Sequence, residues 1–440
     1  MSTDLFLHIQ DTPLCDSHEH LHKENEYVEN GPDLLQNLFS SYLPADLVVA
    51  GASQAEVDAL LDSKNPDLRA RFNGVRKAWE MVRHTGYGEA VRILARELYG
   101  IEEITPEALE AAQDKHAAYR QPGQRLQLLR DKANLDHVQV DDFVRPCSID
   151  PSGPDFFFYD ISWMSFVNVQ ADFAKLVQET GVEVTNLASL RRAMEEVFVR
   201  NANVAIAVKS QHAYNRTLLW QPRSDRDAAL ALAAYLHDPN TMREEERLCL
   251  GDWSLAQGVQ LAIEYDLPFK IHTGYYAGHS RMPVHRIPAG NLSELLRSYP
   301  QARFVLMHIA YPYSDEMVAL AKHYPNVYVD LCWAWSIDPF SSSHFVRQCI
   351  HAVPANKLFI FGGDTFWPAG SFSHALQTRR WLNRTLQAEI DEGLLSESEA
   401  MALVTRYMRE NQYDCFRVAE KKKTILQQLD PEMRETSEIS

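Results

Sequence analysis

The sequence predicts an α/β protein: a (β/α)8 TIM-like barrel with a helical insertion after the first strand and further helices at the C-terminal end. From residue 203 onward, short apolar runs alternate with segments of helical periodicity, which is typical of parallel strands joined by right-handed helical crossovers. Three earlier runs bring the strand count to eight, which favours a barrel over an open sheet. The 440 residues, 45% of them hydrophobic, suffice for such a barrel with insertions.

The eight predicted strands are short and mostly apolar. Within the fourth, small residues share one face with Lys209, and Val204, Ile206 and Val208 share the other. Because small side chains suit a crowded barrel interior, we expect Lys209 to point inward. The predicted strands cover residues 13–18, 137–140, 156–163, 204–209, 268–272, 303–308, 326–331 and 357–362.

A long helical stretch separates the first two strands. Apolar residues recur three or four apart across residues 23–132, and Thr105 followed by Pro106 marks a good helix start. We therefore divide the chain into a barrel, residues 1–22 and 133–440, and an inserted helical subdomain, residues 23–132. Further helices are predicted at 166–178, 187–201, 225–237, 242–265, 291–299, 314–323, 341–352, 371–390 and 396–427.

Charge and composition exclude several partners. The formal net charge of −17 argues against nucleic acid or an anionic membrane, since both need a basic surface. No apolar run approaches the length of a transmembrane helix, and the first residues lack the pattern of a secretory signal. Six scattered cysteines without a Cys-x-x-Cys pair are typical of free thiols in a reducing compartment. We expect a cytoplasmic protein.

Groups capable of metal binding stand where the predicted strands end. The carboxyl ends of parallel barrel strands meet at one mouth, so these groups should lie close together. His18 and His20 are two residues apart, and both therefore leave the first strand on the same face. The full set is His18, His20, Lys209, His272, His308 and Asp364.

Imidazole nitrogens with a carboxylate oxygen suit Zn²⁺ or a similar first-row ion. A lone histidine at a strand end is more often structural, and a His-x-His pair alone is weak evidence. Four histidines and an aspartate at the ends of four strands make a metal site the better interpretation. We expect one or two Zn²⁺ ions, with Mn²⁺ as the alternative.

In this order, these residues resemble the amidohydrolase superfamily of metal-dependent hydrolases. The sequence is most similar to the amidohydrolase-related (amidohydrolase 2) branch, including the amidohydrolase-like domain of FluG-type proteins. The similarity is specific over about 203–420 and 15–22, and weak across 23–200. The stretches that carry it are Val-Lys-Ser-Gln-His-Ala-Tyr-Asn-Arg (208–216), Ile-His-Thr-Gly (271–274), Tyr-Pro-Asn-Val-Tyr-Val-Asp-Leu (324–331) and Phe-Gly-Gly-Asp-Thr-Phe (361–366).

The resemblance implies roles for the strand-end residues. His18, His20 and Asp364 would ligate a first metal. In two-metal members a carbamylated lysine, here Lys209, bridges the ions, and the two remaining histidines hold the second. In single-metal members His272 joins the first site, and His308 contacts substrate or orients water. The sequence leaves both arrangements open.

The function implied is hydrolysis of an amide (C–N) or ester bond in a small molecule, with anions among the candidates, by metal-activated water. Asp364 would take a proton from the water and pass it to the leaving group, and His308 or Tyr214 would help to polarise the carbonyl. A decarboxylase or a uronate-isomerase-like enzyme on the same scaffold is the alternative, and a non-catalytic regulatory domain is a third. Lys209 discriminates: a carbamate between two metals favours hydrolysis, and a free amine facing substrate favours the alternatives.

Other residues are candidates for substrate contact. Tyr214 and Arg216 could meet a substrate carboxylate, or Arg216 could form an ordinary surface ion pair. Trp333 and Trp367 could form an aromatic wall of the ligand site or pack against the insertion. Lys270 shares a face with His272, and we expect it to pair with a buried carboxylate such as Asp16 or Asp330. The expected partners are a small-molecule substrate and further copies of the chain in a homo-oligomer.

Overall fold

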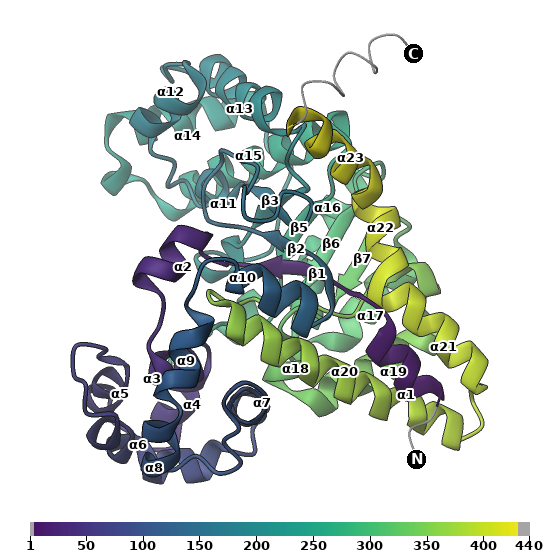
Figure 1. The fold of residues 1–440 in the computed structure, drawn as a ribbon. Helices are drawn as coiled ribbons and strands as arrows, with labels where there is room; N and C mark the ends of the chain where they lie inside the picture. The colour runs from purple at the N-terminus through teal and green to yellow at the C-terminus, as the bar shows by residue number, and fades with distance from the viewer. Residues whose placement is uncertain (1–3, 430–440) are drawn as a thin grey trace.

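The computed structural model describes residues 4–429 and has the predicted fold class (Figure 1). Eight parallel strands pair in chain order, each with the next, in one sheet. The strands are β1 (Leu14–Glu19), β2 (Leu135–Val140), β3 (Phe157–Ser162), β4 (Ala207–Ser210), β5 (Phe269–His272), β6 (Phe304–Met307), β7 (Val327–Asp330) and β8 (Leu358–Phe359). Each lies on one of the predicted runs.

Backbone hydrogen bonds bring the first strand against the segment after the last. The Ser17 N–H donates to the Phe361 carbonyl at 3.1 Å, and the Asp364 N–H donates to the His18 carbonyl at 3.0 Å. These bonds nearly close the barrel. Because they join β1 to the chain beyond β8, they also place the two ends of the sequence motif side by side.

The helices around the barrel follow the predicted series with two corrections. The predicted helix at 396–427 is divided, since Arg417 adopts a positive φ of 50° between the helices Asn411–Phe416 and Val418–Leu429. The predicted helix at 166–178 is two helices, since Val169 adopts a positive φ of 55° between them. The helices that follow β3 to β7 are α11 (Met164–Val167), α12 (Phe173–Thr180), α13 (Leu187–Asn201), α14 (Asp225–His237), α15 (Glu244–Glu264), α16 (Ser293–Ser298), α17 (Ser314–His323), α18 (Ala334–Ile337) and α19 (Pro339–Ala352).

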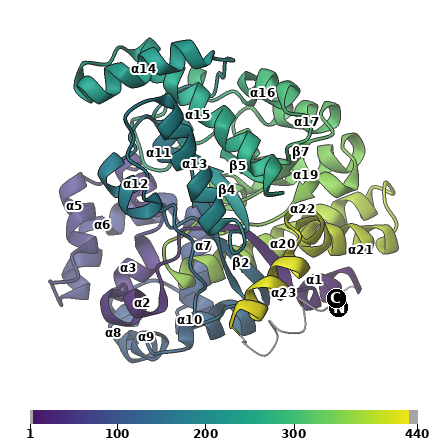
Figure 2. The same ribbon diagram turned by 90° about the horizontal axis from the view of Figure 1, so that it is seen from above.

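Helices from both ends of the chain lie together. In Figures 1 and 2, α21 (Glu397–Thr405) lies near α1 (Asp4–Asp11). The Leu5 N–H donates to Glu397 Oε1 at 3.0 Å, and His8 Nε2 lies 2.8 Å from Thr405 Oγ1. The C-terminal elements are α20 (Pro368–Asp391), α21 (Glu397–Thr405), η8 (Arg406–Glu410), α22 (Asn411–Phe416) and α23 (Val418–Leu429).

Between β1 and β2 the described chain is helical, and Figures 1 and 2 place α2–α9 on one side of the barrel. Thr105 caps the predicted helix start, because its side chain accepts the Ala108 N–H at 3.2 Å and Pro106 opens the first turn. The elements of this helical insertion are α2 (Glu24–Asn30), α3 (Leu34–Phe39), α4 (Leu43–Val49), α5 (Gln54–Leu61), α6 (Leu68–Val82), α7 (Gly86–Tyr99), α8 (Pro106–Ala111), α9 (Gln113–Tyr119), α10 (Gln124–Leu126) and η1 (Gln127–Lys132).

The barrel interior holds a buried ion pair. Lys270 is fully buried, and its Nζ donates to Asp160 Oδ2 at 2.9 Å and to the Ser17 carbonyl at 2.7 Å. The expectation of a carboxylate partner is confirmed, but Asp16 and Asp330 were the wrong choices. Asp160 comes from β3, a strand that the barrel places within reach of β5 although the sequence separates them by more than a hundred residues.

Candidate metal centre

Six side chains from five strands converge at the mouth of the barrel. Asp364 Oδ1 lies 3.4 Å from His18 Nε2 and 3.3 Å from His20 Nε2. Asp364 Oδ2 lies 4.0 Å from His308 Nε2. The six are His18 of β1, His20 directly after it, Lys209 of β4, His272 of β5, His308 directly after β6 and Asp364 beyond β8, and every one is more than nine-tenths buried.

The outer hydrogen bonds of two histidines direct their other nitrogens at the carboxylate. His20 Nδ1 lies 2.6 Å from the Asp141 carbonyl, and His308 Nδ1 lies 2.9 Å from the Cys332 carbonyl. A carbonyl only accepts, so each Nδ1 carries the proton and each Nε2 presents a lone pair. Lone pairs and a carboxylate oxygen that face one another repel unless a cation lies between them.

Unpartnered polar atoms give the same indication. Among the described residues, His308 Nε2 and His18 Nδ1 are buried without a hydrogen-bond partner. Such atoms are rare in folded proteins, and binding of an ion is one of the usual reasons for them. The residues present therefore fit a divalent cation, with His18, His20 and Asp364 able to place one donor atom each within 4.8 Å of the others.

His272 is held differently from its neighbours. Its Nε2 lies 3.0 Å from the Tyr275 carbonyl, which leaves Nδ1 as the free donor atom. Its ring centroid is 4.3 Å from that of His308. The two rings thus lie side by side, but the group of donor atoms close enough to share an ion with His308 is completed by Cys332 and Asp364 and does not include His272, among the described residues.

Lys209 enters the cluster from β4 and is fully buried. Its Nζ lies 3.3 Å from His18 Nε2, and no carboxylate within residues 4–429 forms an ion pair with it. Burial lowers the pKa of the Lys209 ammonium, with nearby Asp141 and Asp364 opposing the shift. This is the environment in which a lysine is most readily neutral.

Burial also lowers the pKa of the four histidines, that of His308 to about 4. The imidazoles are therefore neutral donors near pH 7. Burial by itself would raise the pKa of Asp364, but the hydrogen bond from His18 and the electrostatic interaction with the neighbouring imidazoles outweigh it and hold the pKa well below its usual range. The site thus offers an ionised carboxylate among neutral nitrogens.

Close backbone contacts need glycine at two positions near the cluster. A Cβ on Gly363 would lie 1.9 Å from Glu19 Oε1, and Gly274 has a φ of +73° against the backbone of Ala310 and Tyr311. Gly363 precedes Asp364, and Gly274 closely follows His272. Only glycine permits these approaches, so the two residues fix where the neighbouring donors point.

The predicted substrate residues have different surroundings. The Tyr214 ring packs 4.6 Å from the His272 ring, beside the cluster. The Trp333 ring lies edge-on to His308 at 5.6 Å. Arg216 instead forms an ion pair with Asp252 of α15. The predicted alternative of an ion pair is therefore confirmed, but the pair is buried and not on the surface.

Trp367 lies farther out, against residues that precede and begin the insertion. Its ring centroid is 4.4 Å from that of His22 and 6.2 Å from that of Tyr27 of α2. The neighbouring Phe366 is exposed and stacks on His20 at 5.5 Å, and Phe143 stacks on His20 at 4.3 Å. Of these aromatics, Phe143 is the one that sequence reasoning did not single out. Its position shortly after β2 was the available signal.

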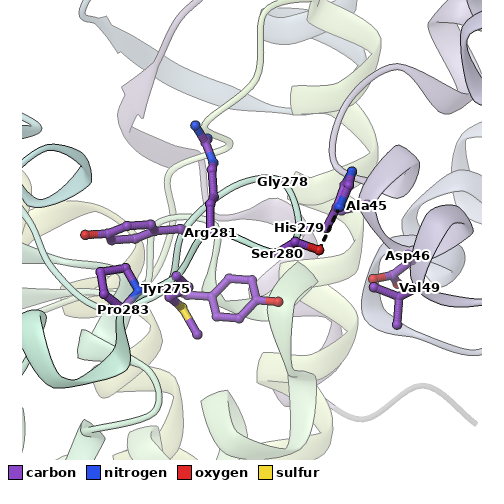
Figure 3. A pocket seen from close by; sticks show the side chains of 11 residues that line it. Ala45, Asp46, Val49, Tyr275, Gly278, His279, Ser280, Arg281 and Pro283 are labelled. Carbon is purple, nitrogen blue, oxygen red and sulfur yellow. Dashed lines mark hydrogen bonds between the residues drawn. The ribbon is translucent and has the colours of Figure 1, made fainter. Parts of the chain in front are cut away.

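A cavity of about 540 Å³ lies between α4 and the loop after β5, and none of the six cluster residues is among those that line it (Figure 3). Figure 3 shows Tyr275 pointing across it toward Asp46 and Val49 of α4, with Arg281 extending from the β5 loop. The Arg281 guanidinium lies 5.6 Å from the centre of the Tyr214 ring, the same ring that packs on His272. One aromatic ring therefore separates this cation from the histidine cluster.

Fold and site together define a (β/α)8 barrel with a candidate histidine–carboxylate metal site at its mouth. The sequence profile of the amidohydrolase family matches residues 169–399. The chain belongs to this family, and membership implies a divalent metal. None of the helices within residues 4–429 is both long and apolar enough to cross a membrane.

Particular relatives are distant. Protein fluG of Emericella nidulans is 29% identical over 189 residues, which cover 39% of this chain and 22% of that protein. The chain thus spans only a small part of that relative. Crystal structures of glucuronate isomerase from Caulobacter crescentus and uronate isomerase from Thermotoga maritima match with TM-scores of 0.77 and 0.76 at 16% and 15% identity. Each covers 94% of this chain, with 93% and 96% of the respective isomerase matched. At these identities they show the fold.

Proposed function

We propose that the chain is a metal-dependent hydrolase that uses metal-activated water to cleave an amide or ester bond of a small anionic molecule. The observation that carries the proposal is the convergence of three buried histidine nitrogens, Nε2 of His18, His20 and His308, on one ionised carboxylate. Of the three, His308 Nε2 has no hydrogen-bond partner among the described residues.

His18, His20 and Asp364 would hold one ion, and Lys209, as a carbamate, would join it to a second on His272 and His308. We propose zinc, because four neutral imidazoles with one carboxylate match its preferred donors. When bound, such an ion acts as a Lewis acid and lowers the pKa of a coordinated water. A neutral, buried amine is the form of Lys209 that can react with CO₂.

Side chains of the protein would then transfer the proton and polarise the substrate carbonyl. Asp364 is ionised and can accept a proton from the attacking water and deliver it to the leaving group. The Tyr214 hydroxyl accepts the Ala277 N–H at 3.1 Å, which leaves its own proton free to donate to a substrate oxygen. Burial raises the pKa of Tyr214, so the phenol keeps this proton at neutral pH.

The cavity beside Tyr214 supports an anionic substrate. Arg281 is its principal cation, and its Nε and one terminal nitrogen donate to the Ala277 carbonyl at 3.2 and 2.8 Å. Those bonds orient the guanidinium, and its remaining N–H groups can bind a carboxylate. A volume of about 540 Å³ lies within the range of small-molecule sites.

A second candidate is isomerisation of a sugar acid. The cavity has Asp46 on one wall and the hydroxyl of Tyr275 and the guanidinium of Arg281 on the other, an arrangement that also suits a polyhydroxylated acid. In that reaction Lys209 would remain a free amine and Asp364 would carry a proton between adjacent carbons.

The test combines metal analysis with a substrate panel. Purified protein is assayed for bound metal by mass spectrometry and for carbamylation of Lys209 by ¹³C NMR after incubation with ¹³CO₂. N-acyl amino acids and lactones are the hydrolysis probes, and D-glucuronate and D-galacturonate are the isomerisation probes. About one metal per chain without a carbamate, together with uronate turnover, would favour the isomerase. Absence of bound metal and no activation by added Zn²⁺ or Mn²⁺ would overturn both readings.

A further inference from the structure

Asp364 has a strained backbone that is held from two sides. Its φ of 55° lies in the left-handed region, which non-glycine residues adopt only when the surroundings enforce it. The Asp364 N–H donates to the His18 carbonyl at 3.0 Å. The Asp364 carbonyl accepts a hydrogen bond from the Tyr42 hydroxyl, immediately before α4 of the helical insertion. One half of this clamp therefore comes from outside the barrel.

Ring packing fixes the position of the Tyr42 hydroxyl. The Tyr42 ring stacks on Trp333 with centroids 4.3 Å apart and on Tyr87 of α7 at 5.4 Å. Trp333 also lies edge-on to His308. Tyr42 thus contacts the loop after β7 through its ring and the loop after β8 through its hydroxyl, and both loops carry or touch donors of the cluster.

The insertion has another anchor that does not depend on Tyr42. Glu89 of α7 accepts hydrogen bonds from Gln377 at 3.1 Å and from Trp381 at 2.7 Å, both on α20. The Gly86 carbonyl accepts a further bond from Gln377 at 2.9 Å. Loss of the Tyr42 hydroxyl should therefore leave the insertion docked on the barrel.

We propose that Tyr42 is a positioning residue that holds Asp364 in the geometry needed for metal binding, so that the helical insertion is part of the metal centre. The proposal rests on the metal centre of the proposed function. By linkage, if docking of Tyr42 strengthens metal binding, then a bound metal strengthens that docking by the same factor. The insertion would act on metal affinity without supplying a ligand.

Tyr42→Phe removes the hydroxyl and keeps the stacked ring. We expect its dissociation constant for Zn²⁺, measured by competition with a chromogenic chelator, to rise about tenfold, the range found when a group that orients a ligand is lost. Tyr87→Phe is the matched control, since it removes a phenol from the same stack that does not contact Asp364, and its dissociation constant should stay within about twofold. Equal Zn²⁺ affinities for Tyr42→Phe and the wild type, or an equal loss in both variants, would overturn the proposal.

Hydrogen–deuterium exchange gives a readout that needs no metal. In the metal-free protein, Tyr42→Phe should accelerate exchange in the peptide that contains the Asp364 amide, and Tyr87→Phe should not. In the wild type, added Zn²⁺ should slow exchange around residues 34–49, and Tyr42→Phe should lose this effect. Unchanged exchange at Asp364 overturns the positioning role even if metal binds. Failure of the wild type to bind metal overturns the proposed function and the coupling, while the exchange at Asp364 still decides the clamp.

Discussion

Lys209 and Lys270, both fully buried in the barrel, should lose different amounts of stability on the same substitution. Lys209 and Lys270 are register partners on adjacent strands, and both side chains are fully buried. Lys270 has a carboxylate partner in Asp160 at 2.9 Å, whereas the Lys209 ammonium has one hydrogen-bond contact within residues 4–429, with His18 at 3.3 Å. This difference sets the expected change in the free energy of unfolding.

Lys270→Met leaves Asp160 as a buried carboxylate without its partner and removes the donor to the Ser17 carbonyl. Breaking one side of a buried pair costs about 3–5 kcal/mol, so we expect a loss of that size. Replacing both partners, as in Lys270→Met with Asp160→Leu, should recover most of it, because no buried charge is left unpaired.

Lys209→Met removes a buried amine that has no carboxylate partner. In the presence of a chelator we expect a change of less than about 1 kcal/mol, roughly the worth of one hydrogen bond. The same variant should lose catalytic activity and the second metal, if Lys209 bridges two ions.

Urea denaturation followed by tryptophan fluorescence, with chelator in all samples, measures both effects. The m-value checks that the variants unfold over the same surface. The reasoning is refuted if Lys209→Met costs as much as Lys270→Met, or if the Lys270 and Asp160 substitutions show no coupling in the double-mutant cycle.

Three further predictions concern metal, pH and substrate. Asp364→Asn should weaken Zn²⁺ binding by more than about 100-fold, because a ligand matters more than the groups that orient it, and calorimetric titration checks this; near-normal affinity would exclude Asp364 as a ligand. Burial lowers the pKa of His212 to about 3 and of His374 to about 4, whereas an unfolded histidine has a pKa near 6.5. As the pH falls below 6.5, the unfolded chain binds protons that the folded protein does not, so the free energy of unfolding decreases. From pH 7.5 to 5.5 each histidine should cost about 1.3 kcal/mol of unfolding free energy, and His374→Gln should flatten the pH profile by one such step. Arg281→Gln should lower kcat/KM about tenfold for an anionic substrate and leave a neutral analogue unaffected; equal losses on both would remove Arg281 from substrate recognition.

Much of the fold and of the candidate site could be predicted from local sequence. The spacing of apolar residues differs between strands and helices, and this difference predicted their alternation. All eight strands accordingly lie on their predicted runs. The six strand-end groups could be named because a parallel barrel brings the carboxyl ends of its strands to one mouth, whatever lies between them.

The sequence could not supply the contacts that depend on how distant segments pack. It indicated that Lys270 needs a carboxylate but not that Asp160 provides it, since which strands face one another across the barrel follows from closure and tilt. It left Arg216 between substrate and an ion pair until α15 placed Asp252 beside it. Nothing local marks Tyr42, because its partner is a backbone carbonyl more than three hundred residues away. Sequence alone determined which side chains could bind a metal. The tertiary structure decided which nitrogen of each histidine is free to do so, how far apart the side chains lie and which residues hold them in place, because these depend on contacts between distant segments.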